Sequence, residues 1–175
     1  MGGDLGPSEV VLGIAKSASM NPEAKFIIHG DSSALSKLIE TKSIQNKCRI
    51  VDAKDIVSMD QKPSYIIRHG KNTSMWSAIQ SVRVGEANVC VSCGNTGALM
   101  ALSMLRLRKS PGVNRPAIAC LWPSRNELGF NIVLDVGADI KADEQDLLQF
   151  ALMGLNYARR GLKISRPRIG LLNVG

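Results

Sequence analysis

The sequence predicts an α/β fold in which a mostly parallel sheet is covered by helices on both faces. Short apolar runs alternate along the chain with segments of helical periodicity. The later runs are apolar at successive positions, which is typical of parallel strands buried on both faces. Three loops rich in glycine and polar residues follow predicted strands, where ligands bind in sheets of this kind.

Periodicity and end signals predict the helices at residues 8–18, 32–40, 73–85, 97–109 and 143–160. Pro7 suits the first turn of the first helix, and Asp31 is placed to cap the second. The third has apolar residues at helical spacing, and the fourth ends before Pro111. The last begins with acidic residues and ends with arginines, as the helix dipole favours.

Short apolar runs predict strands at residues 25–30, 48–53, 87–93, 116–122, 131–137 and 168–175. Residues 54–70 are less regular and contain Pro63. The length suits one α/β domain over residues 1–175. The helix at 143–160 is apolar nearly all round between Leu147 and Ala158, which favours a dimer contact over simple burial.

The composition excludes some classes of protein and favours others. Apolar residues make up 45% of the chain, enough for a core, but no run reaches the ~18 residues of a membrane helix. No basic segment followed by an apolar one marks a secretory signal, so a cytoplasmic protein is expected. The net charge of +7 favours an acidic partner, such as nucleic acid, an anionic membrane or an acidic carrier protein. Aromatic residues are only 4% and basic residues are scattered, which argues against nucleic acid.

The stretch VSCGNTGALM is the first candidate site. It places Gly94, Asn95, Thr96 and Gly97 between a predicted strand and a predicted helix. Free N–H groups at a helix start attract anions, and the glycines allow a ligand to approach the backbone. Neither the dinucleotide fingerprint nor the P-loop motif is present. A plain helix cap explains the same residues equally well.

A second candidate is the loop RHGKNTS, which precedes another helix. Arg68 and Lys71 stand near a helix start, where the dipole disfavours cations, so an anion between them and the helix is one interpretation. Ser74 adds a donor. The alternative is a solvated basic loop.

Carboxylates lie in two glycine-containing loops. Asp135 and Asp139 flank a strand end, and Asp4 lies in a glycine-rich loop; each can orient a substrate or simply cap a turn. Neither histidine, His29 or His69, has an obvious serine or cysteine partner, so any enzyme activity is expected to rest on positioning and charge.

The four cysteines include one C-x-x-C pair, Cys90 and Cys93, without a second pair that a metal site would need. We therefore expect small buried thiols in a reducing compartment and no metal.

Several long motifs resemble, in order, those of the PlsX family of bacterial phosphate acyltransferases: MGGDLGP, KNTSMWSAI, VSCGNTGALMA, RPAIA, VLDVGAD, LLQFALMG and RPRIGLLNVG. The resemblance implies that inorganic phosphate attacks the thioester of a long-chain acyl-acyl carrier protein, giving acyl phosphate and free carrier protein. It also implies a fold similar to that of isocitrate and isopropylmalate dehydrogenases and phosphotransacetylase. A homodimer, peripheral association with the inner membrane, and no metal or nucleotide cofactor are expected with it.

The resemblance also suggests roles for the candidate residues. Asn95 and Thr96 are expected to bind phosphate or the developing oxyanion, with Lys71 as a third catalytic residue. The residues expected to bind phosphate or line the cleft are Gly94, Gly97, Arg68, Ser74, Asp4, Asp135 and Asn173.

This sequence departs from the family pattern in three ways. Cys93 stands where alanine is usual, and Asp139 stands where asparagine is usual. Family chains are about twice as long, so this chain is expected to be the N-terminal half, incomplete at both ends. Two alternatives stay open: a short-chain phosphotransacetylase-like enzyme that uses coenzyme A, and a non-catalytic module that binds carrier protein or membrane.

Overall fold

A computed structural model describes residues 1–136 and 142–172. The chain is mixed α/β and forms two compact units, Met1–Arg108 and Lys109–Gly175. The expected dimer-forming helix, the hairpin strands and Asp135 belong to the second unit, and the other described candidate residues belong to the first.

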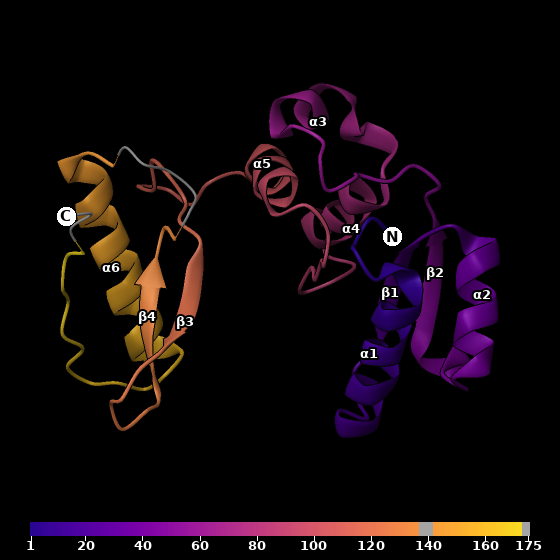
Figure 1. Cartoon of the computed structure of the whole chain (residues 1–175), viewed down its shortest axis with the longest axis horizontal. Coiled ribbons are helices and arrows are strands. Elements are labelled where there is room, and N and C mark those ends of the chain that lie inside the picture. The colour runs from indigo at the N-terminus through magenta and orange to yellow at the C-terminus, as the bar shows by residue number, and fades with distance from the viewer. Residues whose placement is uncertain (137–141, 173–175) are drawn as a thin grey trace. The chain divides into compact units, whose positions relative to one another are not determined.

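The first unit contains a parallel two-stranded sheet, β1 (Phe26–Gly30) and β2 (Cys48–Asp52), shown in indigo and purple in Figure 1. Ile28 of β1 lies in a core with residues of α1 (Gly6–Met20) and α2 (Ser32–Thr41). The next residue, His29, bonds instead to a side chain of α4 (Ser74–Arg83). Because successive strand residues point to opposite faces, helices cover both faces of this small sheet, as predicted.

Local chemistry explains where these helices begin. Pro7 lies in the first turn of α1, and the Asp31 carboxylate accepts the Ala34 N–H at 3.0 Å to cap α2. Thr73 caps α4 through the Trp76 N–H. These three helices were predicted.

A cluster of three helices completes the first unit: α3 (Pro63–His69), α4 and α5 (Thr96–Leu107). Their shared core consists of Val57, Ile66, Met75, Ile79, Ala98 and Leu102. Burying one of the larger aliphatic side chains, such as Ile66, Ile79 or Leu102, contributes about 1.5–3 kcal/mol to the free energy of unfolding. The helix α3 falls within the segment that the sequence left irregular, and Pro63 occupies its first turn, where proline is tolerated. Two 3₁₀ turns, η1 (Gln45–Lys47) and η2 (Gly70–Asn72), precede β2 and α4.

The second unit holds a hairpin in which β3 (Ala119–Pro123) pairs antiparallel with β4 (Phe130–Leu134). The prediction that these two strands are parallel is therefore wrong. Only residues 124–129 join them, enough for a hairpin turn but too few for the crossover of a dozen or more residues that parallel neighbours need.

The helix α6 (Glu144–Arg160) packs against β4, and a Cβ on its Gly154 would lie 2.9 Å from Leu134 Cδ1. Phe150 and Ala158 are buried, while Leu148, Leu152 and Tyr157 are exposed. The dimer contact expected for this helix stays a prediction.

Two further strand predictions are wrong for the described residues. Residues 87–93 form no ladder, and Val91 is 85% exposed. Residues 168–172 also form none, and Leu172 is 85% exposed. An apolar run marks a segment that is able to pair, but pairing needs a neighbouring strand that the run itself does not specify.

Candidate active site around the start of α5

The candidate site is centred on Asn95, which is only 8% exposed and caps α5. Its Oδ1 accepts the Ala98 N–H at 2.9 Å. Its Nδ2 faces three carbonyl oxygens, those of Ser58 at 3.2 Å, Met59 at 3.0 Å and Gln61 at 2.9 Å. Both ends of the amide are thus engaged inside the protein, and one side chain fixes the 58–61 loop to the start of α5.

Two backbone donors at the same helix start remain open. The N–H groups of Thr96 and Gly97 make no hydrogen bond in the part of the chain that the structure describes. Thr96 is exposed, and its hydroxyl is likewise not hydrogen-bonded there. The helix dipole adds a partial positive charge at this point, so the geometry suits an anion.

Glycines bring neighbouring segments close to this loop. A Cβ on Gly97 would lie 2.9 Å from Pro63 Cγ, and one on Gly94 would lie 3.3 Å from Met75 Cε. Gly3 approaches the loop from the N-terminal segment, because its Cβ would lie 3.0 Å from the Cys93 carbonyl oxygen. The starts of α3, α4 and α5 and the N-terminal loop therefore converge on residues 93–97.

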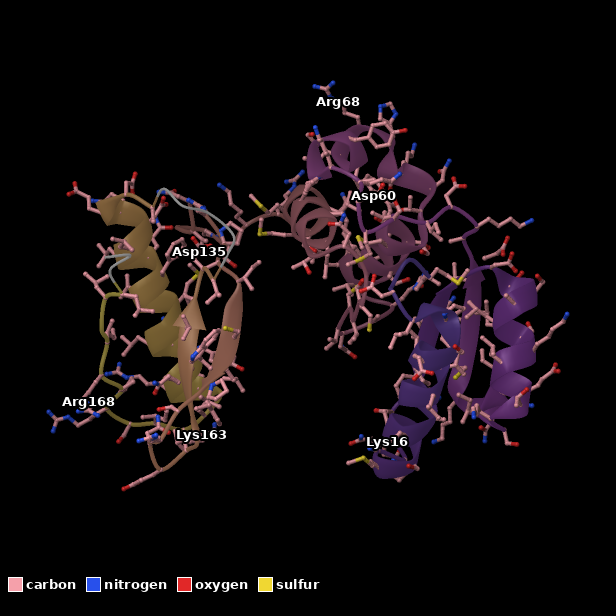
Figure 2. The ribbon with its side chains drawn as sticks, viewed as in Figure 1. Lys16, Asp60, Arg68, Asp135, Lys163 and Arg168 are labelled. Atoms are coloured by element: carbon pink, nitrogen blue, oxygen red, sulfur yellow. The ribbon has the colours of Figure 1, made fainter. Side chains whose placement is uncertain are left out.

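The candidate residues of the second loop are only partly gathered here. Ser74 is buried in the first turn of α4, and its N–H donates to the Asp55 carbonyl at 2.8 Å. Lys71 is exposed in η2, just before that helix. Arg68 is exposed in the last turn of α3, and Figure 2 shows its side chain pointing away from the helix cluster. Neither cation forms an ion pair within the described residues.

The carboxylates lie in different places. Asp4 is exposed in the N-terminal loop that reaches residues 93–97. Asp135 belongs to the second unit, and its backbone has a φ of 64°. Its Oδ2 lies 3.6 Å from Arg115 Nη2, and its buried Oδ1 has no hydrogen-bond partner among the described residues. Asn173 and Asp139 lie outside the described residues.

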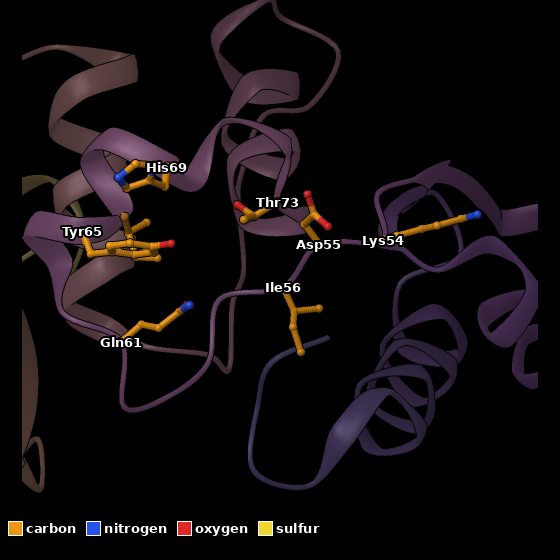
Figure 3. Close-up of a pocket in the computed structure, with 8 residues that line it drawn as sticks. Lys54, Asp55, Ile56, Gln61, Tyr65, His69 and Thr73 are labelled. Atoms are coloured by element: carbon orange, nitrogen blue, oxygen red, sulfur yellow. The ribbon is translucent and has the colours of Figure 1, made fainter.

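An open cleft of about 340 Å³ lies beside the helix cluster. Figure 3 shows the neighbouring rings of Tyr65 and His69, which are tilted by 31° to one another, on one side and Asp55 with Thr73 on the other. The complete lining is Lys54, Asp55, Ile56, Gln61, Tyr65, Ile66, His69 and Thr73. Sequence reasoning missed this cleft because α3, which supplies one wall, was not predicted.

The expectation that neither histidine has a serine partner is wrong for His29. Its Nδ1 lies 2.9 Å from the Ser77 hydroxyl oxygen, across 48 positions in sequence. Burial, followed by the nearby Arg49 guanidinium, lowers the pKa of His29 below its usual 6.5, against an opposing effect of Glu86. The pair lies between β1 and α4, where sequence spacing gives no signal.

All four cysteines are free. Burial raises the pKa of the Cys48 and Cys90 thiols, but Cys93 is exposed, so the expectation of buried thiols is wrong for that residue. Among the described residues, no three histidine, cysteine, aspartate or glutamate side chains gather in a way that could hold a metal ion. No helix in that part of the chain is both long and apolar enough to span a bilayer.

Comparisons with known proteins agree with the motifs. The model of a family described as fatty acid synthesis protein matches residues 1–175. A protein named phosphate acyltransferase from Jannaschia sp. (strain CCS1) is 65% identical over 176 aligned residues, covering 100% of this chain and 48% of that protein. Proteins of the same name from Cereibacter sphaeroides (strain ATCC 17025) and Paracoccus denitrificans (strain Pd 1222) are 66% and 64% identical, again over 100% of this chain and 48% of theirs. The chain spans about half the length of these curated relatives, and it belongs to the fatty acid synthesis protein family, the PlsX family of phosphate acyltransferases.

Proposed function

We propose that this chain carries the anion-binding part of a phosphate acyltransferase of bacterial phospholipid synthesis. An oxygen of inorganic phosphate attacks the carbonyl carbon of a long-chain acyl-acyl carrier protein. The new C–O bond forms, the C–S bond breaks, and the carrier thiolate leaves and takes up a proton. The products are acyl phosphate and free carrier protein. The names of the relatives support this reaction class.

The observation that carries the proposal is the open start of α5. Thr96 and Gly97 present two N–H groups that have no partner among the described residues, and a hydroxyl, at the positive end of the helix dipole. Donors fixed in this way can hold phosphate or stabilise the oxyanion that develops on the thioester. Direct attack by phosphate needs no side-chain nucleophile.

The surrounding residues take supporting roles. Asn95 acts as a positioning residue, because both ends of its amide are bonded to the protein. Lys71 and Ser74, at the start of α4, assist phosphate binding, and Gly94 allows that helix to approach the loop. Asp4 lines the site from the N-terminal loop. We propose that Arg68, Asp135 and Asn173 also bind substrate.

Partners follow from charge and family. The net charge of +7 suits acyl carrier protein and the anionic inner membrane, and we propose a cytoplasmic homodimer that associates with that membrane peripherally. We further propose that residues 1–175 are the N-terminal half of one α/β domain of the dehydrogenase and phosphotransacetylase type, with no cofactor.

The test measures release of free carrier thiol from long-chain acyl-acyl carrier protein, with and without phosphate, using the protein as it occurs in the cell. We expect release to require phosphate and acetyl-coenzyme A not to compete. Replacing Thr96 with valine keeps its shape and removes the hydroxyl, so kcat/KM should fall by ~10²–10³, the cost of losing one oxyanion donor. The same change at Thr41, in the last turn of α2, should have no effect. Release without phosphate would refute the mechanism.

A further inference from the structure

Besides Lys54 and His69, three polar side chains that line the cleft beside α3 have a group with no hydrogen-bond partner in the described residues. The Gln61 Oε1 accepts the Ser58 N–H at 3.0 Å, which leaves its NH₂ group unpaired. The Tyr65 hydroxyl and the Asp55 carboxylate make no hydrogen bond or ion pair within residues 1–136 and 142–172. In Figure 3 the Gln61 amide nitrogen, the Tyr65 hydroxyl and the Asp55 carboxylate all lie around the cleft.

The hydrogen-bonding capacity of these three groups matches one kind of ligand. Gln61 and Tyr65 donate hydrogen bonds, while Asp55 accepts them. A secondary amide offers one acceptor and one donor, so a chain of amides matches this set. The Asp55 carboxylate repels an anion inside the cleft, and more of the lining surface is polar than apolar, which disfavours a fatty acyl chain.

The cleft is also joined to the candidate active site. Asn95 Nδ2, at the start of α5, bonds to the Gln61 carbonyl at 2.9 Å. Thr73, which lines the cleft, caps α4, the helix that carries Ser74. At the other side the exposed Lys54 points outward, as Figure 3 shows, and adds a cation at the rim. A volume of about 340 Å³ falls at the low end of the ~300–1,000 Å³ usual for small-molecule sites.

We propose that this cleft binds the pantetheine arm of the carrier protein, a slender chain of two secondary amides that ends in the thioester. The inference rests on the proposed function, since it assigns a site to part of that substrate. The Gln61 amide and Tyr65 hydroxyl hold an amide carbonyl, and Asp55 accepts an amide N–H. Lys54 at the rim meets the phosphate at the far end of the arm, and the thioester end is directed towards Thr96 and Gly97.

The direct test is an NMR titration of this chain with S-methyl pantetheine, whose blocked sulfur cannot react with the free cysteines. We expect shifts centred on Gln61, Tyr65 and Asp55. Tyr65→Phe removes one hydroxyl and keeps the ring on His69, so it should weaken binding ~3–10-fold, the usual range for one hydrogen bond. Tyr157→Phe is the matched control, because Tyr157 is the other tyrosine and is exposed on α6, outside the cleft. It should change nothing.

Two other probes separate the alternatives. Inorganic phosphate tests the cleft as an anion site, and dodecanol tests it as an acyl site. Shifts at the cleft with either of these and not with S-methyl pantetheine would overturn the proposal, as would no binding of S-methyl pantetheine at 10 mM, roughly ten times a weak millimolar Kd.

Turnover distinguishes this inference from the proposed function. In the protein as it occurs in the cell, Tyr65→Phe should raise KM for acyl-acyl carrier protein several-fold and leave kcat unchanged. Normal phosphate-dependent turnover with an unchanged KM would refute the pantetheine site in the cleft and would support the proposed reaction. Binding of S-methyl pantetheine without phosphate-dependent turnover would reject the reaction and leave the cleft as a carrier-binding site.

Discussion

Replacing Asn95 tests whether one side chain holds the site together. Asn95→Ala removes the cap on the Ala98 N–H and the donor to the carbonyl oxygens of Ser58, Met59 and Gln61. A lost cap costs ~0.5–2 kcal/mol. The two N–H groups of the amide can make two full hydrogen bonds, each worth ~0.5–1.5 kcal/mol. We therefore expect the free energy of unfolding to fall by about 1.5–5 kcal/mol.

Asn95→Asp separates the two roles. Aspartate keeps the capping oxygen and suits the helix dipole. It loses the donor, and it sets a carboxylate oxygen against three carbonyl oxygens. If Asn95 were only a cap, this variant would be as stable as the natural chain. Because the Asn95 amide also holds the 58–61 loop by hydrogen bonds, we expect Asn95→Asp to lose at least as much stability as Asn95→Ala.

Urea unfolding, followed by circular dichroism, measures both variants. Asp31→Asn is the matched control, since Asp31 caps α2 in the same unit and its carboxylate makes only local bonds, to the N–H of Ala34 and the hydroxyl of Ser33. That exchange should change stability by less than about 0.5 kcal/mol. An Asn95→Asp variant as stable as the natural chain would refute the role of Asn95 in holding the 58–61 loop, and other contacts would then have to hold that loop.

Two further predictions concern the first unit. Gly97→Ala should destabilise it by about 1–3 kcal/mol, since the new Cβ would lie 2.9 Å from Pro63 Cγ. The control is Gly13→Ala in α1, whose new Cβ meets nothing within 4 Å and should stabilise the unit by ~0.5–1 kcal/mol. If urea unfolding showed that both changes stabilise, the close packing of Gly97 against Pro63 would be contradicted. Because the pKa of His29 is lowered in the folded state, the unfolded chain binds more protons below pH 6.5, so stability should fall as the pH drops from 6.5 to the folded-state pKa. His29→Gln should flatten that slope, and an unchanged slope would assign it to other groups.

Local signals in the sequence were enough to place most helices. The Asp31 cap and the apolar spacing of the α4 segment depend on residues within one or two turns. They therefore predicted these helices without any knowledge of distant contacts. The polar turn at Gly94–Gly97 and the motifs of the family are also local features, so they too could be identified from the sequence without distant contacts.

Sheet pairing could not be predicted in the same way. The apolar pattern of residues 116–122 and 131–137 marks strands, but direction depends on the connection between them, and six residues allow only a hairpin. Residues 87–93 carry the same pattern and have no partner among the described residues. Pairing is a contact between segments, so a pattern within one segment does not specify it.

By itself, the sequence determined the family, most of the helices and the polar loop at the start of α5 that we propose binds an anion, because these depend on motifs and on neighbouring residues. Only the tertiary structure decided which partners each residue has there. It turned the Asn95 amide inward to three carbonyl groups, left the N–H groups of Thr96 and Gly97 open, and built the cleft beside α3. The physical reason is that a polar group's role depends on which partners satisfy it, and those partners come from segments more than thirty positions away in sequence.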